Sequence, residues 1–154
     1  MFAGDAVSLP SVVPGCELCH QAGGELVAAG DVWRVIRVLD ADFPAFYRVV
    51  WRDHVAEFSE LDAGARGLCM EVVARVESVL RAQLRPTKVN LAAFGNMVPH
   101  LHWHVIARFD WDSHFPQPVW GVRQRDVAEP PAIARLAVPL AALDDAVRQV
   151  LHDL

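Results

Sequence analysis

The chain has 154 residues, of which 53% are hydrophobic and 21% are charged, and its formal net charge at pH 7 is −5. This composition excludes a disordered chain, and the length predicts one domain over residues 1–154 with one sizeable core. No run approaches the ~18 apolar residues of a membrane-spanning helix, and no cluster of Lys and Arg indicates a nucleic-acid surface, so we expect neither partner. Residues 1–5 lack the basic start of a signal peptide, which favours a cytoplasmic location.

Two cysteines lie near the start of the chain, in the run Cys16-Glu17-Leu18-Cys19-His20, after a lead-in over residues 1–15 that we expect to be irregular. A lone C-x2-C is half of a zinc site or a redox pair, and the two thiols can also be unrelated. The redox interpretation requires a thioredoxin-like helix directly after the motif. Gly23 and Gly24 interrupt the chain there, so we rank this interpretation low.

Strand-like composition then marks four segments, residues 32–39, 46–51, 88–94 and 101–108. The break at residues 40–44 is so short that the first two strands are expected to be antiparallel neighbours.

Between the two strand pairs the sequence predicts one long helix. Ser59 is its expected cap, with Asp62 completing a capping-box pattern, and Pro86 ends it. A second helix is expected over residues 139–152. Together these elements predict an α+β fold, with an antiparallel sheet of about five strands and the helices on one side.

Three histidines alternate with apolar residues in the last predicted strand, at His100, His102 and His104. Alternate residues of a strand share one face, so the three imidazoles point one way, roughly 6.7 Å apart along the strand. Leu101 and Trp103 point the other way, into the expected core. A solvated row of histidines is the alternative to a functional site.

Residues 109–120 follow the histidines and are rich in aromatic residues and proline. They form either a loop that covers the sheet or a specificity wall beside the histidines. Trp111 is the residue we expect to stack on a base and bind substrate.

Neutral imidazole is a good nucleophile towards phosphorus, provided that its other ring nitrogen is held as a donor. Alternate histidines on a strand can also share a metal ion, with Asp110 and Asp112 available to complete the site. A metal-dependent enzyme is therefore one alternative, and a non-catalytic nucleotide-binding module is another.

The run from His100 to Ile106 fits the pattern His-φ-His-φ-His-φ-φ, where φ is apolar, and so resembles the signature of the histidine triad (HIT) family. Lys88 to Pro99, before the triad, and Ala107-Arg108-Phe109, after it, are similar to the second half of that family. The resemblance covers about residues 16–112, with residues 113–154 as a C-terminal extension. Within the family, the sequence is most similar to a bacterial branch of small HIT hydrolases, which are diadenosine polyphosphate hydrolase-like.

This resemblance implies a HIT-like fold, a homodimer, and a hydrolase or transferase that acts on the α-phosphate of nucleotides through a nucleotidyl-histidine intermediate. The family's substrates include dinucleoside polyphosphates and nucleoside phosphoramidates. The catalytic residues implied are His100, His102 and His104, with His102 as the nucleophile and His104 beside the phosphate. No cofactor is required for this chemistry.

The substrate-binding positions that the resemblance implies are Asp40 for the ribose, with Asp42 as a rival, and Asn90 and Asn96 on the approach to the phosphates. Met97 stands where many members have Ser or Thr, so the usual hydroxyl donor is absent. Backbone N–H groups from Asn96 to Val98 can still hold phosphate oxygens.

In zinc-binding members of the family, the matching positions implied are Cys16, Cys19, His54 and His100. Two thiolates and two imidazoles complete a tetrahedral set, so the resemblance predicts a structural zinc ion outside the chemistry. His20, next to Cys19, offers a different ligand.

Overall fold

The computed structural model describes residues 11–154, and what the sequence suggests about residues 1–10 lies outside these described residues. The lead-in is irregular over residues 11–16, as expected. The strands are β1 (Glu25–Ala29), β2 (Trp33–Arg37), β3 (Phe46–Trp51), β4 (Lys88–Ala92) and β5 (His102–Arg108). The α-helices are α1 (Glu17–His20), α2 (Ala63–Leu84) and α3 (Leu140–Val150), and short 3-10 turns cover Phe58–Glu60 and Ala132–Arg135.

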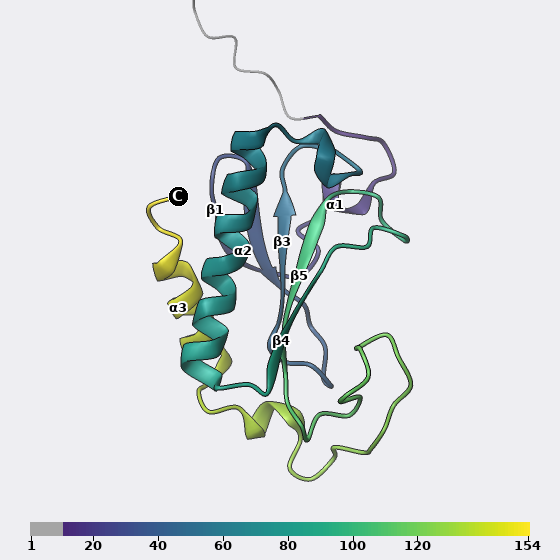
Figure 1. Cartoon of the computed structure of the whole chain (residues 1–154), viewed down its shortest axis with the longest axis vertical. Helices are drawn as coiled ribbons and strands as arrows, with labels where there is room; N and C mark the ends of the chain where they lie inside the picture. The colour runs from purple at the N-terminus through teal and green to yellow at the C-terminus, as the bar shows by residue number, and fades with distance from the viewer. Residues whose placement is uncertain (1–10) are drawn as a thin grey trace, which may run out of the picture.

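The five strands form one antiparallel sheet in the order β1-β2-β3-β5-β4, which confirms the predicted α+β fold (Figure 1). In the pairing of β3 with β5, Arg48 lies opposite His104 and Val50 opposite His102. Strand β1 is outside the four strands delineated from the sequence. It is short, contains two alanines and carries an irregularity between Leu26 and Ala28, so its alternation is weak.

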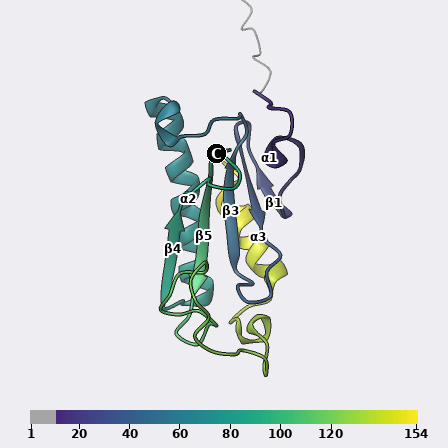
Figure 2. The same cartoon turned by 90° about the vertical axis from the view of Figure 1, so that its right-hand side faces the viewer.

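Helices α2 and α3 cover one face of the sheet, and both lie behind the strands in Figure 2. The main core fills the space between these layers. It takes Leu101, Val105 and Ala107 from the β5 region, with Trp103 and Phe109 packed against them, as the alternation predicts. The opposite face, which carries the histidines, is covered near α1, where Leu18 packs on Ile36 and Val50.

The long helix begins later than predicted. Ser59 lies in the 3-10 turn, which has its own capping box between Glu57 and Glu60, and the N-cap of α2 is Asp62, whose carboxylate accepts from the Ala65 N–H at 2.8 Å. Helix α2 ends at Leu84, because Arg85 adopts a left-handed conformation with φ of 48° directly before Pro86.

The C-terminal helix is tied to the sheet by a buried polar contact. Asp144 of α3 accepts a 2.6 Å hydrogen bond from the Tyr47 hydroxyl and pairs with Arg37 at 3.0 Å. Burial and the neighbouring carboxylate raise the pKa of Tyr47, so its phenol stays protonated as the donor. In the described part of the chain, no helix has the length and apolar character needed to cross a membrane.

Candidate functional site

Strand β5 presents His102 and His104 on the sheet face opposite the long helices. Both are buried, with relative exposures of 8% and 4%, and His100 in the bend just before β5 is fully buried. This burial contradicts the alternative of a solvated row of histidines. The rings of His102 and His104 meet edge to face, with centroids 4.9 Å apart.

The orientation of His102 is set by the main chain. Its Nδ1 lies 2.6 Å from the carbonyl oxygen of His100, which can only accept, so Nδ1 carries the proton. Burial lowers the pKa of His102, and the positive charge of Arg48 lowers it further. The imidazole is therefore neutral near pH 7, and its Nε2 holds a lone pair.

The side chain of His104 lies beside Arg48 of the neighbouring strand. Arg48 Nε donates to His104 Nδ1 at 3.3 Å. Burial lowers the pKa of His104 to about 3, with smaller effects from repulsion by a protonated His102 and by the positive charge of Arg48. His104 is therefore also a neutral imidazole at physiological pH.

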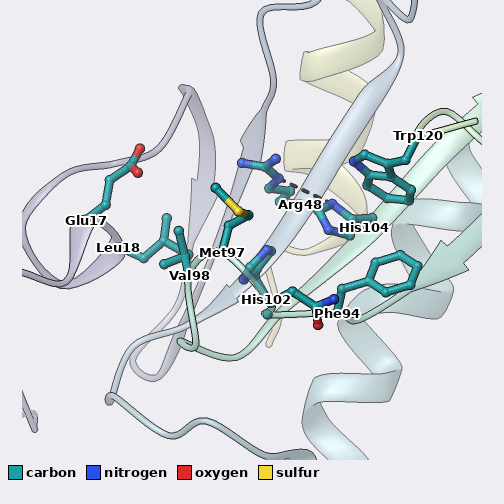
Figure 3. A pocket seen from close by; sticks show the side chains of 11 residues that line it. Glu17, Leu18, Arg48, Phe94, Met97, Val98, His102, His104 and Trp120 are labelled. Atoms are coloured by element: carbon teal, nitrogen blue, oxygen red, sulfur yellow. Dashed lines mark hydrogen bonds between the residues drawn. The ribbon is translucent and has the colours of Figure 1, made fainter.

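Both histidines line a cavity of about 460 Å³ (Figure 3). The other lining residues are Glu17, Leu18, Arg48, Phe94, Gly95, Asn96, Met97, Val98 and Trp120. Gly95 has φ of +69°, a conformation that favours glycine, and this lets the chain turn between β4 and β5. The turn brings Asn96, Met97 and Val98 to the rim of the cavity, where the Met97 side chain is 94% exposed.

Aromatic side chains form one wall of the cavity around His104. The Trp120 ring lies 5.0 Å from the His104 ring and 4.8 Å from Phe94, while Phe46 meets His104 edge to face at 5.4 Å. Trp120 and Phe94 are 55% and 59% exposed, so large aromatic faces remain available to a planar ligand.

Trp111, chosen from the sequence as the stacking residue, lies outside the residues that line this cavity. Its ring stacks on Phe109 at 4.7 Å, and Arg135 lies over it at 5.2 Å. Of the aromatic segment at residues 109–120, Trp120 is the part found in the described lining of the cavity.

Two further sequence-chosen residues also lie outside the lining of the cavity. Asp40 caps its own loop, since its carboxylate accepts from the N–H groups of Asp42 and Phe43 at 2.9 and 3.2 Å. The Asn90 side chain accepts from Arg108 at 2.8 Å. Each therefore has a local structural role.

Arg108 anchors the segment that follows β5. Its guanidinium pairs with Asp112 at 2.8 Å and donates to the carbonyl of Gln117 at 2.7 Å, and both charged side chains are 2% exposed. Because both Asp112 oxygens also accept backbone N–H groups, this carboxylate is not free for a metal ion. The anchored segment leads to Trp120.

A second cluster lies at the start of β5. One ligand atom from each of Cys16, Cys19, His54 and His100 lies within 4.8 Å of every other. His100 Nδ1 is 3.5 Å from Cys16 Sγ and 3.4 Å from Cys19 Sγ, and Cys19 Sγ is 3.5 Å from His54 Nδ1. A tetrahedral zinc ion with ordinary bond lengths has sulfur-to-nitrogen edges of about 3.5 Å, so the four residues fit zinc.

The second ring nitrogen of His100 supports this arrangement. Its Nε2 lies 2.6 Å from the carbonyl oxygen of Trp51, which makes Nε2 the protonated nitrogen and leaves Nδ1 free as a metal ligand. The cluster contains neither His102 nor His104.

A comparison with protein-family models matches residues 21–111 to the HIT domain. The chain belongs to the HIT domain family. At the level of the family, it is a protein of the nucleotide-binding and hydrolase type. A comparison with curated proteins found no match.

Solved structures of HIT proteins resemble this HIT domain over most of its length. A histidine triad protein from Bradyrhizobium japonicum is 28% identical, with a TM-score of 0.70, over 92% of this chain and 99% of that one. One from Marinobacter aquaeolei is 25% identical, with a TM-score of 0.67, over 86% and 92%. A zinc-bound histidine triad family protein from Mycobacterium smegmatis shares the fold at 15% identity, with a TM-score of 0.59, over 90% and 94%.

Several residues that line the cavity of this HIT domain were not selected by sequence reasoning, namely Glu17, Leu18, Arg48, Phe94 and Gly95. From the segment at residues 109–120 it selected Trp111 instead of Trp120. Arg48 has a detectable signal, because it is a charged residue within the otherwise apolar run of β3. The signal for Trp120 is the aromatic segment at residues 109–120, but which of its aromatic side chains reaches the cavity depends on how Arg108 and Asp112 fold the intervening chain.

Proposed function

We propose that this protein is a nucleotide hydrolase or nucleotidyl transferase that acts on the α-phosphate of nucleotides through a nucleotidyl-histidine on His102. The observation that carries the proposal is the 2.6 Å contact from His102 Nδ1 to the His100 carbonyl. It leaves the Nε2 lone pair of a neutral imidazole for the cavity. The diadenosine polyphosphate hydrolase-like branch is part of this proposal, with dinucleoside polyphosphates or nucleoside phosphoramidates as substrates.

In the first step, the His102 Nε2 lone pair forms a bond to the α-phosphorus, and the bond from phosphorus to the leaving group breaks with its electron pair. The imidazole becomes positively charged, and the His100 carbonyl stabilises this charge through the Nδ1–H. In the second step, water or another acceptor attacks the same phosphorus. The P–N bond breaks, the proton of the attacking group passes to solvent, and His102 returns to its neutral form.

We assign the phosphate to the space between the histidines and the turn at residues 95–98, with His104 and the backbone N–H groups of Asn96 to Val98 as its contacts. Met97 supplies no hydroxyl, so the leaving group receives no proton from this position. We leave Asp40, Asn90 and Trp111 outside the proposed site, because their side chains have the local partners described above.

The test is to capture the covalent intermediate. The protein is mixed with adenylylated and guanylylated substrates, quenched without acid because P–N bonds are acid-labile, and measured by intact mass spectrometry. We expect one added nucleoside monophosphate on the wild type and on the control His152→Ala, whose side chain is exposed near the C-terminus. His102→Ala should carry none. Residual turnover above about a tenth in His102→Ala would contradict the proposal, since loss of a nucleophile costs several orders of magnitude.

A non-catalytic nucleotide-binding module is the second candidate, and Met97 is the observation that favours it, because the expected hydroxyl donor is missing. The same substrate panel separates the two: nucleotide binding by calorimetry with neither adduct nor product on any substrate would establish the module. The metal-dependent alternative has weaker support, because the metal-type cluster among the described residues leaves out His102 and His104.

We also propose that Cys16, Cys19, His54 and His100 hold a structural zinc ion, as their distances support. The fold is shared with a zinc-bound histidine triad protein. When bound, zinc would supply cross-links from the N-terminal segment to β5, and no chemical step uses it. Two reduced thiols in a zinc site are typical of a cytoplasmic protein, so we propose a cytoplasmic location. We also propose that the chain is a single domain and that it forms a homodimer.

A further inference from the structure

Arg48 is the charged residue of β3, and its side chain extends into the cavity beside His104 (Figure 3). A partly buried guanidinium normally pairs with a carboxylate, yet no ion pair within the described residues includes Arg48. Among the described residues, the one side-chain hydrogen bond of Arg48 runs from its Nε to His104 Nδ1, at 3.3 Å. The partner of the Arg48 guanidinium is therefore a histidine of the candidate site.

Its position is fixed from two further directions. Arg48 and His104 are directly opposite each other in the β3–β5 register, so their side chains leave the sheet on the same face. The guanidinium carbon lies 5.5 Å from the ring centre of Phe46, and that buried ring meets His104 edge to face. Phe46 therefore supports both members of the pair.

The direction of this hydrogen bond determines where His104 carries its proton. Arginine Nε–H can only donate, so His104 Nδ1 must be the acceptor and carry a lone pair. A neutral imidazole has one N–H, which is then on Nε2. The low pKa of His104 supports a single proton on this ring. His102 has the opposite arrangement, with its proton on Nδ1 and its lone pair on Nε2.

We propose that Arg48 is a positioning residue that fixes His104 with its proton on Nε2, as a hydrogen-bond donor to the phosphate that His102 attacks. Without Arg48, His104 is free to carry its proton on Nδ1 and to turn a lone pair towards the anionic oxygen. The role towards phosphate rests on the proposed function. The placement of the proton is a property of the free protein and is tested without substrate.

The first measurement is long-range ¹H–¹⁵N NMR of protein labelled with ¹⁵N-histidine, in which protonated and unprotonated ring nitrogens have well-separated shifts. The His104 signals are assigned by their loss in His104→Gln. We expect the Nε2–H form in the wild type, a change towards Nδ1–H in Arg48→Met, and the Nε2–H form again in Arg48→Gln, because an amide can donate without charge. Arg81→Met, which removes an exposed arginine of α2, is the control and should leave the signals unchanged.

The second measurement is turnover by the same variants. Removing one oriented donor to a developing anionic oxygen lowers kcat by about 100-fold or more in other enzymes. We therefore expect a loss of about 100-fold for Arg48→Met, with Arg48→Gln recovering to within about tenfold of wild type. An Nδ1–H form of His104 in the wild type, or an unchanged tautomer in Arg48→Met, overturns the proposal. Equal losses of kcat in the Met and Gln variants overturn the donor role in catalysis.

These outcomes are separable from those of the proposed function. If Arg48→Met fails to fold, the wild-type spectrum alone still decides the position of the proton. If no substrate is turned over, the proposed function fails while the NMR result stands on its own.

Discussion

His102 and His104 stand two residues apart on one strand, but they meet different kinds of partner. His102 donates to a main-chain carbonyl, whereas His104 accepts from a guanidinium on the neighbouring strand. Two chemically identical side chains are thereby given different protonated nitrogens. The difference comes from what lies behind each ring, and burial keeps both rings neutral.

The pKa of His104 predicts how stability depends on pH. In the unfolded chain this imidazole takes up a proton as pH falls below its ordinary value of 6.5, whereas in the folded protein it does so only near 3. Between these values the unfolded state binds more protons, so the free energy of unfolding should fall as pH falls from about 6.5 towards 3.

Urea unfolding at several pH values from 7 to 4 measures this effect, and His104→Gln should show a shallower loss of stability with acid. The contribution of one such group is up to a few kcal/mol. His152→Ala, which alters an exposed imidazole, should follow the wild type. Identical slopes for the wild type and His104→Gln would show that His104 does not carry this dependence.

The segment after β5 acts as an element although it has no regular structure. Buried Arg108 pairs with Asp112 and with the Gln117 carbonyl, and the chain then delivers Trp120 to the cavity. One end of the segment therefore supports the fold and the other borders the site. Trp111 belongs to the first part and Trp120 to the second.

Substitutions of the two tryptophans should separate these roles. Trp120→Ala should raise KM for a nucleotide substrate about tenfold, because stacking on a base contributes about 1–3 kcal/mol, with little change in Tm. Trp111→Ala is the matched control and should lower the free energy of unfolding by about 1 kcal/mol while leaving KM near wild type, since it loses its stacking on Phe109. A higher KM in Trp111→Ala than in Trp120→Ala would reverse the assignment.

Elements whose pattern is local could be predicted from the sequence, and those set by distant partners could not. The alternation from His100 to Phe109 predicts both faces of β5, and the capping pattern together with Pro86 predicts a long helix where α2 lies. The cap of α2 was misplaced, because Ser59 and Asp62 both fit the local pattern and the 3-10 turn decides between them.

The candidate site divides in the same way. The histidines and the C-x2-C are visible as motifs, whereas the contacts of Asp40 with its own loop are seen only in the structure. The position of Arg48 beside His104 could not be predicted from the local sequence. It depends on the β3–β5 register, which pairs residues 56 positions apart.

At the scale of the whole molecule, the cysteine cluster joins the N-terminal segment to the sheet. Cys16 directly precedes the short α1 and Cys19 lies within it, while His54 follows β3 and His100 precedes β5. A metal ion shared by these residues would close loops between distant parts of the chain, which restricts the unfolded state.

Protein purified without chelator should therefore contain about one equivalent of zinc, and the double variant Cys16→Ser, Cys19→Ser should contain none and have a lower Tm. Its kcat should stay within about tenfold of the wild type at a temperature where it is folded, because zinc takes no part in the proposed steps. Cys69→Ala, which removes the buried thiol of α2 outside the cluster, should keep its zinc. Less than a tenth of an equivalent in the wild type, with unchanged melting of the double variant, would refute the site.

His100 belongs to both sites, but it serves them with different atoms. Its imidazole joins the cysteines, whereas its carbonyl oxygen orients His102. Every amino acid carries that carbonyl, so the orientation of His102, the proposed nucleophile, does not depend on which side chain occupies position 100. A related protein would thus be able to lose the cysteines and the imidazole at position 100 and still retain the proposed chemistry of His102, provided that the backbone conformation at position 100 is unchanged.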